Sequence, residues 1–185
     1  MKMGKLILIT GIGNVGKSTL RREFRDFICS AGTRASHYDA DNFKKLRCEA
    51  DKDCLSEFAD PDVNEVLIVE DVHATVEDAV LPLEAYDCIL YVQASNVFSH
   101  ILFWLPRAWR WFQNGQFDWD QKTGWKGTGV RYDPRNIIPI LRELWSNFQN
   151  GKKWIAGDMK ALEPYSNTIF IRSSWTRRGP EFRFE

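Results

Sequence analysis

The sequence predicts an α/β fold in which a parallel sheet of about five strands is covered by helices on both faces. Continuous runs of Val, Leu and Ile, such as "EVLIVED" (65–71) and "CILYVQA" (88–94), are typical of strands buried on both faces. Segments with apolar residues at helical spacing separate these runs. Strands that alternate with helices form parallel sheets with right-handed crossovers. At 185 residues, the chain (1–185) is expected to form a single domain.

The first predicted element is a strand, a glycine-rich loop and a helix in direct succession. Residues 6–9 are a short apolar run, 11–18 match the pattern G-x-x-x-x-G-K-[ST], and 19–30 have helical spacing up to Gly32. This context is typical of a phosphate-binding loop, because the backbone N–H groups and the helix N-terminus both favour anions.

The loop residues have distinct expected roles. The glycines allow the backbone to curl tightly around phosphate. Lys17, expected as a surface-loop residue, would reach the β- and γ-phosphates, and the Ser18 hydroxyl would ligate Mg²⁺. The residues expected to contact the nucleotide are Gly11, Gly13, Asn14, Val15, Gly16, Lys17, Ser18 and Thr19.

The remaining elements follow from local patterns of apolar and turn residues. Further strands are expected at 34–41, 65–71, 88–94 and 167–173. Further helices are expected at 42–58, 75–83, 97–112 and 135–150. Pro106 is expected to kink or divide the helix in which it lies. The aperiodic segment 114–134 is expected to be a loop, and the residues after 173 a polar tail.

Charge and composition restrict the class of partner. The chain has 25 Lys and Arg residues and 25 Asp and Glu residues, so its net charge is zero. Proteins that follow a nucleic-acid backbone usually have a strong basic excess, so a small-molecule partner is favoured over a polynucleotide. No apolar run approaches the roughly 20 residues that span a bilayer. The four cysteines are scattered, as expected of free thiols in a cytoplasmic protein.

The glycine loop alone fits both a GTPase and a kinase. A GTPase would carry N-K-x-D after a later strand, but "SNVFSH" follows the strand 88–94. It would also carry D-x-x-G, but Asp71 is followed by "VHA". The resemblance to GTPases therefore covers only residues 11–20.

A second segment resembles kinases. "YDADNFKKL" (38–46) is similar to the D-x-D-N segment of adenylylsulfate kinases, and more loosely to the acidic strand ends of polynucleotide 5′-hydroxyl, gluconate and uridine kinases. The chain thus resembles the P-loop kinase superfamily, which implies a P-loop NTPase three-layer sandwich. In that superfamily such carboxylates face the acceptor hydroxyl, a role that falls here to Asp41 or Asp39. Asp41 is equally suited to cap a helix. Adenylylsulfate kinases carry arginine where this chain has Lys44, so that acceptor is not implied.

The resemblance also implies a metal site and a lid. Glu70 or Asp71, at the end of a strand expected beside the phosphate loop, would hold Mg²⁺ or its water shell. A lid-like insertion at about 107–135 would bring cations over the phosphates. Arg107 and Arg110 are the first candidates, and solvated surface is the alternative for both. The other candidates are Lys122, Lys126, Arg131 and Arg135.

These features together predict an ATP- and Mg²⁺-dependent phosphotransferase that acts on a hydroxyl of a small acceptor, such as a nucleoside or a related metabolite. One alternative is a kinase for hydroxyls within polynucleotides. Another is a non-catalytic nucleotide-binding switch or GTPase-like module. The paired acids at 39 and 41 favour the enzyme.

Overall fold

The computed structural model of the chain describes residues 5–39, 65–72, 75, 81–113 and 137–185. The helices in this part are α1 (Lys17–Ser30), α4 (Val97–Gln113) and α6 (Ile137–Leu162), with a short 3₁₀ turn η1 (Leu83–Ala85). The strands are β1 (Lys5–Thr10), β2 (Arg34–Asp39), β3 (Glu65–Glu70), β4 (Cys88–Ala94), β5 (Thr168–Thr176) and β6 (Gly179–Phe184). The predicted alternation of strands and helices is therefore present.

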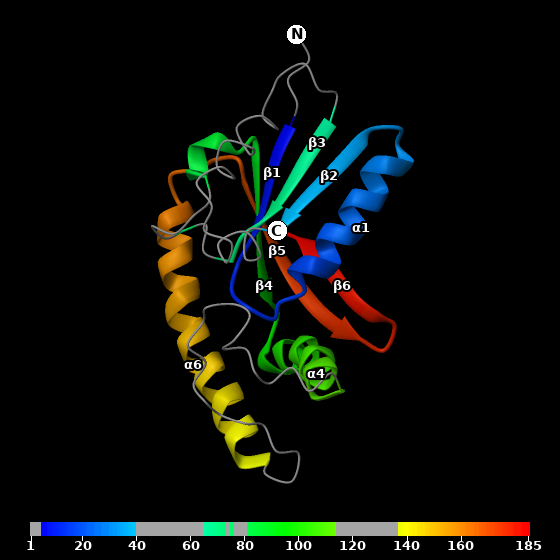
Figure 1. Cartoon of the computed structure of the whole chain (residues 1–185). Helices are drawn as coiled ribbons and strands as arrows, with labels where there is room; N and C mark the ends of the chain where they lie inside the picture. Colours follow the sequence, from blue (N-terminus) through cyan, green and yellow to red (C-terminus); the bar gives the residue numbers. More distant parts are fainter. Residues whose placement is uncertain (1–4, 40–64, 73–74, 76–80, 114–136) are drawn as a thin grey trace, which may run out of the picture.

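The described strands form one six-stranded mixed sheet in the order β2-β3-β1-β4-β5-β6. β1 to β5 pair in parallel, as expected, and β6 pairs antiparallel to β5. β1 lies between β3 and β4, so the loop after β1 begins at the centre of the sheet (Figure 1). The fold is α/β and compatible with that of P-loop NTPases.

Two hydrophobic clusters occupy opposite faces of the sheet because side chains alternate along each strand. On β1, Leu6 and Leu8 belong to one cluster, while Ile7 and Ile9 belong to the other. α1 covers the Ile7–Ile9 face through its apolar side chains Leu20, Phe24 and Ile28. The C-terminal end of α6 contributes Leu162 to the opposite face. α1 and α6 accordingly flank the sheet on opposite sides (Figure 1).

The structure corrects the predicted end of the last helix. α6 runs to Leu162 and passes through Gly151, although the sequence predicts an end at residue 150. Gly151 is buried, and a Cβ atom there would lie 3.2 Å from Ile12 Cδ1. This glycine thus permits close packing against the loop after β1 and does not end the helix.

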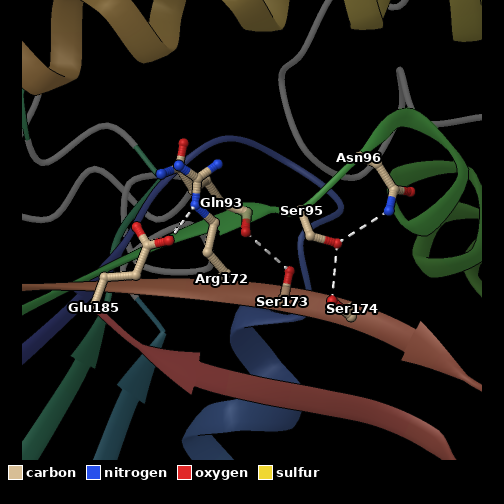
Figure 2. A network of polar contacts seen from close by, with 7 residues as sticks. All are labelled: Gln93, Ser95, Asn96, Arg172, Ser173, Ser174 and Glu185. Carbon is tan, nitrogen blue, oxygen red and sulfur yellow. Dashed lines mark hydrogen bonds and ion pairs between the residues drawn. The ribbon is translucent and has the colours of Figure 1, made fainter.

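The predicted polar tail is wrong as well. Residues 179–184 form β6 after a turn at 177–178, and Gly179, the first residue of the strand, has a φ of 108°. The partly buried Phe182 packs against the core on the α1 face. An ion pair of 2.9 Å between Arg172 Nε and Glu185 Oε1 joins the end of the chain to β5 (Figure 2).

Two further helices differ from their predictions in the structure. The helix predicted at 75–83 does not include Leu81 and Pro82, which are not helical, while Thr75 lies in a turn. Pro106 lies within α4, which continues through it without division. The helix predicted at 42–58 and the loop predicted at 114–134 lie outside the described residues.

Polar contacts hold the start of α4 against the carboxyl end of β5. The Ser99 backbone N–H donates to Asn96 Oδ1 at 2.8 Å, which is the hydrogen bond of a helix N-cap. Ser95 Oγ accepts from Ser174 Oγ at 2.8 Å and from Asn96 Nδ2 at 3.3 Å (Figure 2). The Trp175 backbone N–H donates to Ser99 Oγ at 3.2 Å. These bonds fix the first turns of α4 at the edge of the sheet where β1 ends.

Candidate functional site

The phosphate-loop motif adopts a tight turn between β1 and α1. Gly11 and Gly16 have φ values of 131° and 86°, which favour glycine, and Asn14 is left-handed with a φ of 58°. Gly13 does not have a positive φ, and a Cβ atom there would meet no protein atom within 4 Å. Gly11 and Gly16 thus adopt backbone conformations that favour glycine, whereas Gly13 does not.

The loop is packed tightly against the elements around it. A Cβ atom on Gly11 would collide with the carbonyl oxygen of Val92 in β4. A Cβ atom on Gly16 would lie 2.6 Å from Cε1 of Phe103 in α4. The Phe103 ring is in turn packed edge-on against Trp175 of β5, with 5.1 Å between ring centroids. These contacts leave no room for a side chain at Gly11 or Gly16.

Lys17 is more buried than the sequence suggests. Its side chain is 5% exposed, and Nζ donates hydrogen bonds to the carbonyl oxygens of Gly11 at 2.9 Å and Ile12 at 2.6 Å. The ammonium group thus lies inside the turn of the loop and not on its surface. α1 begins directly at this residue, without a side-chain N-cap and without an acidic residue in its first turn. The helix terminus therefore presents its partial positive charge to the loop.

The two candidate metal acids lie in different surroundings. The Ser18 hydroxyl donates a hydrogen bond of 2.7 Å to Glu70 Oε1. Arg21 Nε lies 3.4 Å from Glu70 Oε2. β3 is adjacent to β1, with Glu70 opposite Ile9, as the sequence predicts for the strand that carries the metal acid. Glu70 is therefore the acid that the fold brings to the phosphate loop.

Asp71 follows β3 and is fully buried. Its backbone N–H donates to the Ile9 carbonyl at 3.1 Å. Burial, followed by the Asp71 charge, raises the pKa of the Tyr86 hydroxyl above its ordinary value. Tyr86 belongs to the hydrophobic cluster on the face opposite α1. Asp71 and Glu70 are adjacent in sequence, so their side chains project to opposite faces where the strand ends.

Of the two predicted acceptor-facing acids, only Asp39 is described. It ends β2, directly opposite Glu70 in the parallel register. Both residues lie at the carboxyl edge of the sheet, where ligands collect in open α/β folds. Asp41 lies outside the described residues.

The side chains of the predicted lid cations lie outside the part of the chain that the structure describes. Residues 107–113 continue the backbone of α4, and the side chains of Arg107 and Arg110 are not among those described. The remaining lid candidates, Lys122, Lys126, Arg131 and Arg135, fall outside the described residues.

A pocket of about 410 Å³ opens beside Ser18, between α1 and β2. It is lined by Ser18, Thr19, Arg21, Arg22, Arg25, Asp26 and His37. Neither these arginines nor His37 are among the site residues predicted from the sequence. The sequence does contain a pattern that indicates this group: Ser18, Arg21 and Arg25 are spaced by three and four residues and so share one face of α1.

His100 is another residue of this region that is not among the site residues predicted from the sequence. It lies in the first turns of α4 and is 6% exposed. Burial, and secondarily the Lys17 cation, lower the pKa of His100 from its ordinary value. Both effects favour the neutral imidazole. In the sequence, His100 could have been found from its position shortly after β4, the strand that pairs with β1.

The described residues contain no group of three or more His, Cys, Asp and Glu side chains that could hold a metal ion by themselves. A divalent cation at Ser18 and Glu70 would therefore need further ligands, such as phosphate oxygens and water. Within the same part of the chain, no helix is long and apolar enough to cross a membrane.

Comparisons with known proteins give distant structural likeness only. No protein-family model matches the chain, and neither does any curated protein sequence. The chain is similar to the crystal structure of APE1195, with 15% identity and a TM-score of 0.46 over 83% of this chain and 97% of that one. It is also similar to a possible uridine kinase from Bacillus stearothermophilus, with 13% identity and a TM-score of 0.39 over 72% and 90% of the two chains. At these scores, function has to be argued from the residues of the site.

Proposed function

We propose that the chain is an ATP- and Mg²⁺-dependent phosphotransferase with the three-layer P-loop NTPase fold, acting in the cytoplasm on a hydroxyl of a small acceptor. One observation carries this proposal. The Ser18 hydroxyl of the glycine loop is hydrogen-bonded at 2.7 Å to Glu70, at the end of the adjacent strand. Phosphoryl transfer needs a phosphate cradle, a cation and a metal-holding acid at one place, and this contact joins the loop to the acid.

The residues at this contact fit magnesium. Hydroxyl and carboxylate oxygens are ligands that Mg²⁺ accepts. Glu70 Oε2 is buried and accepts no hydrogen bond in the described part of the chain, and its one contact there is the 3.4 Å ion pair with Arg21 Nε, which a bound cation would replace. Ser18 and Glu70 would hold the ion, which would neutralise charge on the phosphates. Lys17 would turn from the Gly11 and Ile12 carbonyls to the β- and γ-phosphates.

The acceptor side of the reaction falls to the end of β2. Asp39 lies opposite Glu70 in register at the carboxyl edge of the sheet, on the strand next to the one that carries Glu70. A carboxylate there can orient the acceptor hydroxyl and receive its proton. We assign this role to Asp39 or Asp41. Arg107 and Arg110, on α4, remain proposed as cations that approach the phosphates from the lid.

A transfer screen tests the proposal. The protein is incubated with Mg²⁺-ATP, or with Mg²⁺-GTP for comparison, and with nucleosides, nucleotides, sugars or 5′-hydroxyl oligonucleotides. Thermal shift records binding, and product analysis records transfer. We expect transfer to a small acceptor, with ATP used at least as well as GTP because no guanine-reading N-K-x-D is present. Transfer to oligonucleotides alone would favour the polynucleotide kinase. A GTP preference above about a hundredfold, roughly 2.7 kcal/mol, would favour the GTPase-like module.

A further inference from the structure

We propose that the acceptor carries a phosphate group, and that this group is bound in the pocket beside Ser18 by the guanidinium groups of α1, chiefly Arg25 and Arg22. This inference rests on the proposed phosphotransferase function and specifies its substrate class. The acceptor would then be a small phosphomonoester with a hydroxyl, and not a neutral nucleoside or sugar.

The position of the pocket connects it to the transfer site. Its lining begins at Ser18 and continues along α1 to Arg25. On the other side lies His37 of β2, whose Nδ1 is 3.5 Å from Arg25 Nη1. His37 is two residues before Asp39 on the same strand, so both side chains project from the same face. A molecule in this pocket would therefore reach Ser18 at one end, on the face of the sheet to which Asp39 also projects.

The charge of the lining favours an anion. Three arginines face the pocket against one acid, Asp26. Arg25 Nη2 lies 3.6 Å from Asp26 Oδ1, but the two side chains are 42% and 62% exposed, and such surface pairs are weak. Arg22 has no ion pair with any of the described residues. Both guanidinium groups can therefore take a phosphate, whose oxygens match their planar fork of donors.

The pKa of His37 also indicates that the electrostatic potential in the pocket is positive. Its pKa is lowered from the ordinary value, first by burial and then by the charges of Arg21 and Arg25. Asp39 and Glu70 act in the opposite direction, each by less than either arginine. The positive charge of α1 thus prevails over the neighbouring carboxylates at this position.

The volume of the pocket favours a small molecule. About 410 Å³ lies at the lower end of the range for small-molecule sites. Phosphodiester backbones are usually bound along extended basic grooves. We therefore assign the pocket to a phosphomonoester and not to a polynucleotide.

A binding experiment tests the pocket without any turnover. The phosphate loop is first saturated with Mg²⁺ and AMP-PNP, and inorganic phosphate is then titrated by calorimetry. Arg25→Ala is expected to weaken phosphate binding at least fivefold, with Arg25→Lys intermediate because lysine keeps the charge and loses the fork. Arg178→Ala, an exposed arginine in the turn between β5 and β6, is the matched control and should bind as wild type does. Equal phosphate affinity in wild type and Arg25→Ala would overturn the inference.

A kinetic experiment uses acceptor pairs that differ only by a phosphate group, such as uridine with uridine 5′-monophosphate and ribose with ribose 5-phosphate. The phosphorylated member is expected to have the higher kcat/KM, by about tenfold or more. Arg25→Ala should raise KM for that member with little change in kcat. Preference for the neutral members, or for 5′-hydroxyl oligonucleotides, would overturn the inference and leave phosphotransfer intact. Failure to bind AMP-PNP at all would instead contradict the proposed function.

Discussion

Lys17→Ala is expected to reduce phosphate transfer by about 100- to 1,000-fold, the usual cost of losing one group that stabilises transition-state charge. ATP affinity should fall as well. The ammonium group already lies inside the loop, on the carbonyl oxygens of Gly11 and Ile12, so it is positioned to meet the phosphates without a large rearrangement. Steady-state kinetics and calorimetry with ATP measure the two effects.

Stability controls separate this loss from unfolding. Lys17 is 5% exposed, so its removal also deletes two hydrogen bonds. At about 1 kcal/mol for each bond, the free energy of unfolding should fall modestly and the variant should remain folded. Lys153→Ala, at an exposed position of α6, is the matched control and should leave transfer unchanged. Undiminished ATP affinity with full turnover in Lys17→Ala would contradict the assignment of the loop.

Glu70→Gln is expected to weaken Mg²⁺ affinity and slow transfer by about 10- to 100-fold. The amide oxygen can still accept the hydrogen bond from Ser18, so the geometry is retained and mainly the charge is lost. A Mg²⁺ titration of the turnover rate measures this effect. The required Mg²⁺ concentration should rise in this variant.

Asp71→Asn is the matched comparison, because the sequence alone could not choose between these two acids. Asp71 is fully buried, and it influences Tyr86 on the face of the sheet opposite α1. Its replacement should lower stability by about 1–3 kcal/mol, the usual cost of disturbing a buried polar group, with a nearly normal Mg²⁺ requirement. If Asp71→Asn raised the Mg²⁺ requirement and Glu70→Gln did not, the metal role would belong to Asp71.

The parts of the fold that sequence predicted are those set by nearby residues. The run 88–94 is the strand Cys88–Ala94, and the apolar residues around the glycine loop form β1 and α1. Each is recognisable from one short apolar period and the turn residues beside it. The same local pattern predicts that an acid, Glu70 or Asp71, follows the strand beside β1.

The parts that sequence missed depend on contacts between distant segments. Glycine often ends a helix, and the sequence therefore predicts a helix end before Gly151. In the structure, Gly151 instead allows close packing against Ile12, which is more than a hundred residues away in the sequence. β6 forms because the hairpin packs Phe182 into the core, whereas its charged residues suggest a solvated tail.

The choice between Glu70 and Asp71 likewise depended on which face of β3 α1 covers. That face becomes visible only when Ser18 and Arg21 are seen beside Glu70. The same placement brings Arg25 to His37 and so creates the pocket.

The most direct test of phosphotransfer is the fate of the γ-phosphate of ATP. The protein is incubated with Mg²⁺ and ATP labelled on the γ-phosphate, with and without the acceptor identified in the screen, and the label in organic product and in inorganic phosphate is measured. We predict that most of the label passes to the acceptor, and that loss of ATP is slow without it. Label released only as inorganic phosphate, at a rate that no acceptor changes, would contradict the account.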